Sequence, residues 1–404
     1  MKKNSFIIIS LICLYLFCLP FVPTQSSEWL LSGTIVLAGA IYIYELIKYR
    51  EVRTNFTIGL KKTMAEPFSL LFSLLVLIML ITSFFAVSKT TAIKESIRYT
   101  YYLGIYLFVR LRVNDTKYHK IIITSAMTSG GVACIIGLIQ FFKNYKLGYD
   151  LVRVLWLSRV SGPMPHPNTF AAYIIILIFP AICITLKSKN KSKIVYLLLS
   201  VMLCFNLAVT FSRNGWIGFL IGVLLLTIVV NWKWIFLYAI PAIFVFMSPT
   251  FVERLKQISD SSTNSGRLHL WQMALRVIQD NFFTGVGNGN FVKVFDRYIE
   301  KYPYLKISEP GPLPPHNSYL KIFSEVGVFA IIALLLMCGE IIRKSYTVVK
   351  KCEGYMKHFY SGFFISVVCF FIMNCFDDLL FIPKVTTYFI VFISMMYCID
   401  TSSV

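Results

Sequence analysis

Long apolar runs alternate with short polar connectors along most of the chain. Each run has the length that a helix needs to cross a bilayer, roughly 20 residues. The pattern predicts membrane-spanning helices at about 6–22, 29–47, 67–86, 96–111, 120–142, 169–186, 194–210, 215–231, 234–248, 326–342, 358–376 and 384–399. One long polar segment, residues 249–325, interrupts this pattern.

Composition agrees with the pattern. The 404 residues are 57% hydrophobic and only 14% charged, with a mean hydropathy of +0.70, whereas soluble domains carry about 25% charged residues. The runs are continuous and do not alternate residue by residue, which excludes a barrel. We therefore expect an all-α polytopic membrane protein with about 12 transmembrane helices. Its parts would be a first bundle at 1–248, an extracytoplasmic helical loop at 249–325 and a last bundle at 326–404.

The net charge of +20 gives the expected orientation. In a soluble protein it would suggest nucleic acid, but cytoplasmic loops of membrane proteins are enriched in Lys and Arg. Most of the basic connector residues fall on one side if the N-terminus lies inside. We therefore expect both termini in the cytoplasm, the polar segment outside and no nucleic-acid partner. A site in that segment is cut off from cytoplasmic nucleotides.

The polar segment has three notable stretches. The first is an amphipathic run with Leu268, Trp271, Leu275 and Ile278 at helical spacing, for which Ser265 is a plausible N-cap. The second is a glycine-rich turn with glycines at 285, 287 and 289. Because it does not follow a β-strand, we interpret it as a tight turn and not as a dinucleotide motif. The third is Pro315-His316-Asn317-Ser318, where the chain re-enters the membrane.

Arginines near the expected outer surface are candidates for binding an anion. Arg213 lies in a short outer turn, Arg267 begins the amphipathic run, and Arg159 ends an outer connector. Guanidinium groups bind phosphate oxygens bidentately, so three of them together would hold a diphosphate. The alternatives are an interfacial arginine bound to lipid headgroups for Arg213 and a solvated helix face for Arg267.

His316 is the candidate base, since histidine titrates near neutral pH; the alternative is a structural residue beside a helix cap. His166 is a secondary candidate for sugar or phosphate contact, and Asn168 could cap the helix that follows it. Asn317 and Arg276 complete the expected substrate-binding set with Arg159, His166 and Asn168. Asp377 and Asp378 could stabilise an arginine or contact an acceptor. They are too few oxygen ligands for Mg²⁺, so we expect no metal and no cofactor.

Several short motifs, taken in their order along the chain, resemble those of the O-antigen ligase and polymerase family. They are Ser212-Arg213-x-Gly215-Trp216, Gly266-Arg267-x3-Trp271, Gly285-Val286-Gly287-x-Gly289-x-Phe291 and Pro315-His316-Asn317-x-Tyr319-Leu320 with Glu325-x-Gly327. His166-Pro167-Asn168 also looks like that family.

The resemblance implies a fold similar to the GT-C class and a transferase in the bacterial inner membrane. It implies a glycan donor linked to undecaprenyl diphosphate and an acceptor that is either lipid A core, for ligases, or another repeat unit, for polymerases. If the residues at the matching motif positions have the roles that they have in the family, Arg213 and Arg267 would hold the donor diphosphate. His316 would then deprotonate the acceptor hydroxyl, with inversion at the anomeric carbon. Membrane lipids would surround the bundle.

Two other functions stay open. A transporter or flippase of lipid-linked sugars would need ionisable residues in mid-span on several helices, and few occur besides Arg98. A membrane partner without catalysis would tolerate alanine at Arg213, Arg267 and His316. The residues do not distinguish a ligase from a polymerase.

Overall fold

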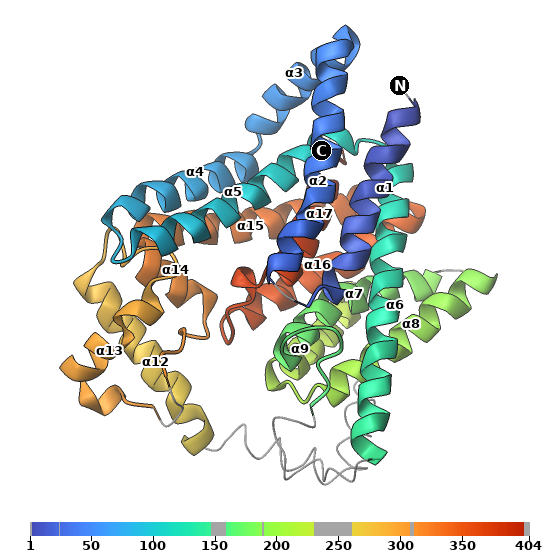
Figure 1. Ribbon diagram of the computed structural model, residues 1–404. Coiled ribbons are helices and arrows are strands. Elements are labelled where there is room, and N and C mark those ends of the chain that lie inside the picture. The colour runs from blue at the N-terminus through green and yellow to red at the C-terminus, as the bar shows by residue number, and fades with distance from the viewer. Residues whose placement is uncertain are drawn as a thin grey trace.

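The computed structural model describes residues 2–23, 25–146, 159–187, 190–229, 261–307 and 311–399. Every regular element in these ranges is a helix (Figure 1). In chain order they are α1 (Lys2–Cys18), η1 (Leu19–Phe21), α2 (Gln25–Lys48), α3 (Arg50–Met64), α4 (Pro67–Thr82), η2 (Ser83–Phe85), α5 (Lys89–Arg112), α6 (Thr116–Lys146), α7 (Pro167–Lys187), α8 (Asn190–Val209), α9 (Arg213–Val229), α12 (Ser261–Asp280), α13 (Phe291–Lys301), η4 (Pro303–Leu305), α14 (Ser318–Val326), α15 (Val328–Lys351), α16 (Gly354–Met373), η5 (Leu379–Phe381) and α17 (Pro383–Tyr397).

The expected all-helical membrane fold is confirmed in its main feature. Among the described residues, six helices are long and apolar enough to cross a membrane: Leu31–Lys48, Pro67–Phe85, Thr116–Lys143, Pro167–Leu186, Lys191–Val209 and Gly354–Met373. Two shorter apolar helices, Ser5–Phe21 and Arg213–Val229, add to them. Twelve spans and the GT-C likeness stay predictions, and the expected span at 234–248 lies outside the described residues.

Helix α7 forms the centre of the bundle. Its side chains are buried without interruption from Thr169 to Thr185, and α16 and α8 pack against it. Gly362 of α16 lets the two helices approach closely, because a Cβ atom there would lie 2.3 Å from the backbone nitrogen of Pro180. Small residues allow such contacts between membrane helices. The start of α7 therefore has a fixed position, and the sequence before it carries His166 and Arg159.

Helix α3 was not predicted. Its sequence is mainly polar, with Val52 and Thr63 as its buried residues, so a search for apolar runs takes it for a connector. Arg53 donates hydrogen bonds to the carbonyl oxygens of Leu46 and Ile47 at the end of α2, both at 3.2 Å. Unpaired carbonyls at a helix end favour such a cationic donor.

The described part of the polar segment, residues 261–307 and 311–325, is mainly helical, as expected, and α12, α13 and α14 gather beside the turn between α4 and α5 (Figure 1). Two details differ from the prediction. Helix α12 begins at Ser261, so Ser265 lies within the helix and is not its N-cap. Its packed face carries Leu270, Met273, Ala274 and Val277, whereas Leu268 and Leu275 are about half exposed, at 52% and 50%. The core that receives this face comes from α13 and the following turn, mainly Phe291, Phe295 and Leu305.

The glycine-rich segment is a tight turn, as predicted. Gly285, Gly287 and Gly289 have φ values of 63°, 101° and 74°, a region that glycine adopts without strain. Gly287 donates its N–H to the carbonyl oxygen of Glu325 at 2.7 Å. The Glu325 carboxylate in turn accepts the N–H groups of Gly289 and Phe291, at 2.8 and 3.2 Å. The turn therefore fixes the end of α14, the helix that begins just after His316.

Candidate functional site

His316 lies directly before α14 and faces Asp377, which follows α16. Its Nδ1 atom is 3.4 Å from Oδ1 of Asp377, and the side chains are 31% and 11% exposed. His316 has a φ of 49°, which is uncommon for a residue with a side chain. Such conformations persist where the surroundings hold them, often at functional sites. The ring is thus presented from a constrained backbone next to a nearly buried carboxylate.

The residues after His316 supply that constraint. Asn317 caps α14, since its Oδ1 accepts the N–H groups of Tyr319 and Leu320, both at 3.0 Å. The N–H of Asn317 donates to Oδ1 of Asp378 at 2.9 Å. Ser318 donates its hydroxyl to Oδ1 of Asn374 at 2.6 Å. The segment is therefore attached to the end of α16 on both sides of the cap.

Asp377 also connects to a residue of α7. Its Oδ2 accepts from Nδ2 of Asn168 at 2.9 Å. The Oδ1 of Asn168 accepts from Nη2 of Arg159 at 2.8 Å, and Nε of Arg159 donates to the carbonyl oxygen of Thr210 at 2.9 Å. Asn168 lies in the first turn of α7, which begins at Pro167, and its side chain makes these bonds instead of capping the helix. Four distant segments of the chain therefore meet at this point.

His166 belongs to the same group. Its Nδ1 lies 3.2 Å from the N–H of Asn168 and accepts from it. Burial lowers the pKa of His166, and the positive charge of Arg159 lowers it further against the attraction of Asp377. A lowered pKa favours the neutral form of His166 at pH 7. That form can offer a hydrogen bond to a sugar without adding charge.

The two adjacent carboxyl groups differ in character. Burial raises the pKa of Asp377, but its hydrogen bond to His316 and the charges of His316 and Arg267 outweigh burial, and the pKa is lowered overall. Burial raises the pKa of Asp378 above its usual range, although the charge of Lys321 opposes this. Asp377 is thus the carboxylate that stays ionised beside His316.

Arg267 and Arg213 lie on two further helices at this end of the bundle. Arg267, on α12, is half-buried, and its charge acts on both Asp377 and His166. The α12 helix also contacts the α16 end through Trp271, whose ring centroid is 6.2 Å from that of Phe376. Arg267 is therefore within electrostatic range of Asp377 and His166.

Arg213 is the first residue of α9 and is half-buried. Ser212 accepts the N–H of Gly215 at 3.2 Å, which is a capping contact. Asn214 donates to the carbonyl oxygen of Met373 at 2.9 Å, at the end of α16. A helix N-terminus favours negative charge, and Arg213 adds a positive side chain at the start of α9.

One expected binding residue lies apart from this group. Arg276 is on an exposed part of α12, donates to Oε1 of Gln279 at 3.1 Å and lies over the ring of Tyr302. The structure brings together Arg159, His166, Asn168, Asp377 and His316 through the contacts above, with Arg267 and Arg213 on neighbouring elements. Asn317 joins them as the cap of α14.

The sequence did not reveal that Asp377 is the partner of His316. From the sequence, Asp377 and Asp378 were expected only to stabilise an arginine or to contact an acceptor. Nothing in their spacing indicates a contact with a histidine far away in the chain. The one signal was that this is an acidic pair in an expected outer turn of a chain with few carboxylates. A carboxylate held against Nδ1 orients an imidazole, an arrangement that general bases use in known enzymes.

The chain resembles known proteins across part of its length. The family model described as O-antigen ligase matches residues 197–335, a range that begins in α8 and ends in α15. An O-antigen ligase of Salmonella typhimurium is 29% identical over 273 residues, which cover 63% of this chain and 63% of that protein. A ComP-specific O-oligosaccharyltransferase of Acinetobacter baylyi is 23% identical over 278 residues, covering 63% of this chain and 45% of that protein.

The chain thus spans less than two thirds of the length of either relative. The matched family range holds Arg213, Arg267, the glycine-rich turn and His316, while Asp377 lies beyond it. The resemblance to the O-antigen ligase family that the motifs indicate is confirmed by this match.

Proposed function

We propose that this chain is a membrane glycosyltransferase that moves a glycan from undecaprenyl diphosphate to an acceptor at the outer face of the bacterial inner membrane. The observation that carries the proposal is the His316–Asp377 pair, 3.4 Å apart, at the end of the bundle that also carries Arg159, Arg213 and Arg267. The names of the two relatives support glycan transfer. The bias of basic residues supports cytoplasmic termini and an outward site.

Arg213 and Arg267 are the proposed donor-binding residues. The bond that breaks joins the anomeric carbon to a diphosphate oxygen, and the electron pair leaves with that oxygen. Negative charge on the leaving group grows in the transition state, so guanidinium groups already in place stabilise it most there. Two arginines supply this charge, and for that reason we propose a reaction without a metal ion.

His316 is the proposed base. Its Nδ1 faces Asp377, which leaves Nε2 to take the proton of the acceptor hydroxyl as the oxygen attacks the anomeric carbon. The ionised Asp377 stabilises the imidazolium that forms. Attack opposite the departing diphosphate inverts the configuration at that carbon.

The remaining residues of the site have supporting roles in this proposal. Asn168 donates to the second oxygen of Asp377, and Arg159 holds Asn168 in place, while Asn317 fixes the backbone next to His316. The neutral form of His166, which is half-buried, suits a contact with a sugar hydroxyl. Arg276 contacts Gln279 and Tyr302, so we leave it out of the substrate site.

The acceptor is the open part of the proposal. One relative is named an O-antigen ligase and the other an O-oligosaccharyltransferase specific for ComP, so acceptors differ between proteins to which this chain is similar. We keep lipid A core and a second repeat unit as the two candidates. The donor chemistry is the same for both.

Transfer by the purified full chain tests the proposal. The chain in lipid nanodiscs would receive an undecaprenyl-diphosphate glycan with either lipid A core or a second donor molecule as acceptor. We expect release of undecaprenyl diphosphate coupled to a new glycosidic bond with one acceptor. Movement of the donor across the bilayer without bond formation would support a flippase instead, and no reaction with either acceptor would contradict this function.

A further inference from the structure

Two aromatic rings meet at the segment that carries Asp377. Trp271 of α12 and Phe376, in the turn after α16, have ring centroids 6.2 Å apart and ring planes inclined at 42°. Phe376 directly precedes Asp377, the partner of His316. Trp271 follows Arg267 by four residues, so both project from the same face of α12. The ring pair therefore connects the segment of the proposed base with the helix of a proposed donor-binding arginine.

The turn after α16 distributes its side chains against the usual pattern. Its polar residues Asn374, Asp377 and Asp378 are buried, with exposed fractions of 0%, 8% and 7%, whereas Phe376 is 37% exposed. Buried polar groups and exposed apolar ones are the informative departures from ordinary burial. The ring of Phe376 is thus available to a ligand directly beside the candidate base pair.

Trp271 supplies the second ring and an unused donor. Its ring is half-buried, and its indole N–H is buried and donates to no residue that the structure describes. A buried tryptophan N–H usually has an acceptor. The ring is therefore held by packing, and it would lose no hydrogen bond by turning toward a ligand that offers an acceptor.

A sugar ring is the ligand that fits both features. One face of a pyranose carries mainly C–H groups, which pack against an aromatic ring, and its edge carries hydroxyl oxygens, which accept an N–H. The spacing fits as well, because four residues span about 6 Å along a helix, which is similar to the size of one sugar. A diphosphate at Arg267 would therefore place the sugar attached to it near Trp271.

We propose that Trp271 and Phe376 form the binding platform for the first sugar of the donor glycan, the one joined to the diphosphate. The inference rests on the proposed function. A sugar held by Phe376 lies beside Asp377 and His316, where the proposed attack on its anomeric carbon takes place. Aromatic rings also contact lipid at membrane–water interfaces, but a lipid contact does not distinguish a donor with sugar from one without.

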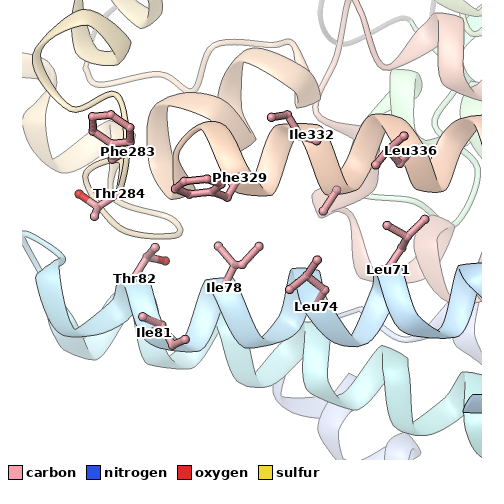
Figure 2. A pocket seen from close by; sticks show the side chains of 11 residues that line it. Leu71, Leu74, Ile78, Ile81, Thr82, Phe283, Thr284, Phe329, Ile332 and Leu336 are labelled. Carbon is pink, nitrogen blue, oxygen red and sulfur yellow. The ribbon is translucent and has the colours of Figure 1, made fainter.

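Three ligands test the platform: undecaprenyl diphosphate without sugar, the same lipid with only its first sugar, and the complete glycan donor. Binding of each is measured to the full chain in nanodiscs. The variants are Trp271→Ala, Phe376→Ala and Trp271→Phe, of which the last keeps a ring and loses the N–H. The matched control is Phe283→Ala, because Phe283 is an exposed ring that lines a groove between α4 and α15 (Figure 2) and takes no part in the platform.

We expect Trp271→Ala and Phe376→Ala to bind both sugar-bearing ligands about tenfold more weakly than the wild type, as the loss of an aromatic contact implies. Trp271→Phe should lose about threefold, since only one hydrogen bond is removed. All three variants should bind the sugar-free lipid as the wild type does, which also shows that they are folded. Phe283→Ala should match the wild type with all three ligands.

Unchanged affinity for the sugar-bearing ligands in all three platform variants would overturn the inference. An equal loss for all three ligands in Trp271→Phe would overturn it too, because the ring would then be a membrane or folding contact.

Glycan transfer by the wild-type chain, measured in the same nanodiscs, separates this inference from the proposed function. Intact transfer with no effect of the platform variants on sugar binding removes only the platform. Sugar binding that depends on Trp271, without any transfer, removes the proposed reaction and keeps the sugar site. A wild type that neither binds the donor nor transfers glycan contradicts both.

Discussion

Nδ1 of His316 lies 3.4 Å from Oδ1 of Asp377, although 61 residues separate the two in the chain. The pair exists because α14 and α16 meet at the Asn317–Asp378 and Ser318–Asn374 hydrogen bonds. A second hydrogen bond, from Asn168, holds the other oxygen of Asp377. The carboxylate therefore has a fixed position from which it can orient the imidazole.

Replacement of Asp377 tests this relationship. Asp377→Asn keeps the size of the side chain but removes the negative charge that stabilises a protonated His316. We expect the rate of glycan transfer to fall by roughly 10²-fold, the lower range for loss of general base catalysis, with little change in the affinity for the donor. Single-turnover rates and donor binding, measured separately, check both parts.

The matched control for that variant is Asp280→Asn. Asp280 forms an exposed ion pair with Lys301 at 3.0 Å, far along α12 from the candidate site, and exposed pairs contribute little to stability. Its transfer rate should equal that of the wild type. An Asp377→Asn rate that is also unchanged would show that His316 needs no carboxylate partner.

Arg267 and Arg276 lie on the same helix but in different surroundings. Arg267→Ala should lower the transfer rate by roughly 10²–10³-fold, by analogy with the loss of one oxyanion-hole donor. Arg276→Ala should stay within about twofold of the wild type, as exposed substitutions usually do. Steady-state transfer assays on both variants decide this. A large loss for Arg276→Ala would return that residue to the substrate site.

Glu325 makes stability depend on pH. Burial raises its pKa from 4.5 to about 7, although the N–H groups of Gly289 and Phe291 oppose this. The folded chain therefore binds this proton more tightly than the unfolded chain. The stability that the neutral carboxyl contributes is complete below pH 4.5 and is lost as the pH rises through 7.

Glu325→Gln should remove this dependence, because the amide is neutral at every pH and its oxygen can still accept an N–H. The difference in unfolding free energy between wild type and variant should change between pH 4.5 and 7 by about 1.4 kcal/mol for each unit of pKa difference. Denaturant unfolding of both proteins in one detergent, across that pH range, measures it. Parallel curves would contradict the buried neutral carboxyl.

Gly285 should not tolerate a side chain. It has a φ of 63°, and a Cβ atom there would lie 2.3 Å from the backbone carbon of Glu325. Gly285→Ala should therefore destabilise the chain by at least about 1–3 kcal/mol, the usual range for a residue forced into this region. Gly266, inside α12, has nothing within 4 Å of its Cβ position, so Gly266→Ala should be neutral or stabilising by about 0.5–1 kcal/mol. Thermal unfolding of both variants measures these changes. Equal changes in stability for Gly285→Ala and Gly266→Ala would contradict the turn geometry.

The sequence was most informative where one property repeats along the chain. Continuous apolar runs predicted the long helices, and three glycines at spacing two predicted a turn that the positive φ values confirm. Helix α3 could not be predicted from apolar runs. It is held by the contacts of Arg53 with α2 and by a few buried side chains.

The candidate site was predictable only in part, for a related reason. Arg213, Arg267 and His316 stand in short motifs that resemble a family, so they were found. The Asp377–His316 pair, the Asn168–Asp377 hydrogen bond and the packed face of α12 depend on how helices meet in space. Leu268 and Leu275 fit a helical period as well as Leu270 and Val277 do, and only the partner helix selects the buried set.

In the proposed reaction His316 takes the proton while Arg213 and Arg267 hold the diphosphate. The most direct measurement is a single-turnover assay on wild type, His316→Gln and Arg213→Ala, with donor affinity measured on the same samples and expression and folding checked. We predict that His316→Gln binds the donor as the wild type does but transfers glycan at least about 10²-fold more slowly, whereas Arg213→Ala loses both affinity and rate. Wild-type transfer rates in both variants would contradict these roles.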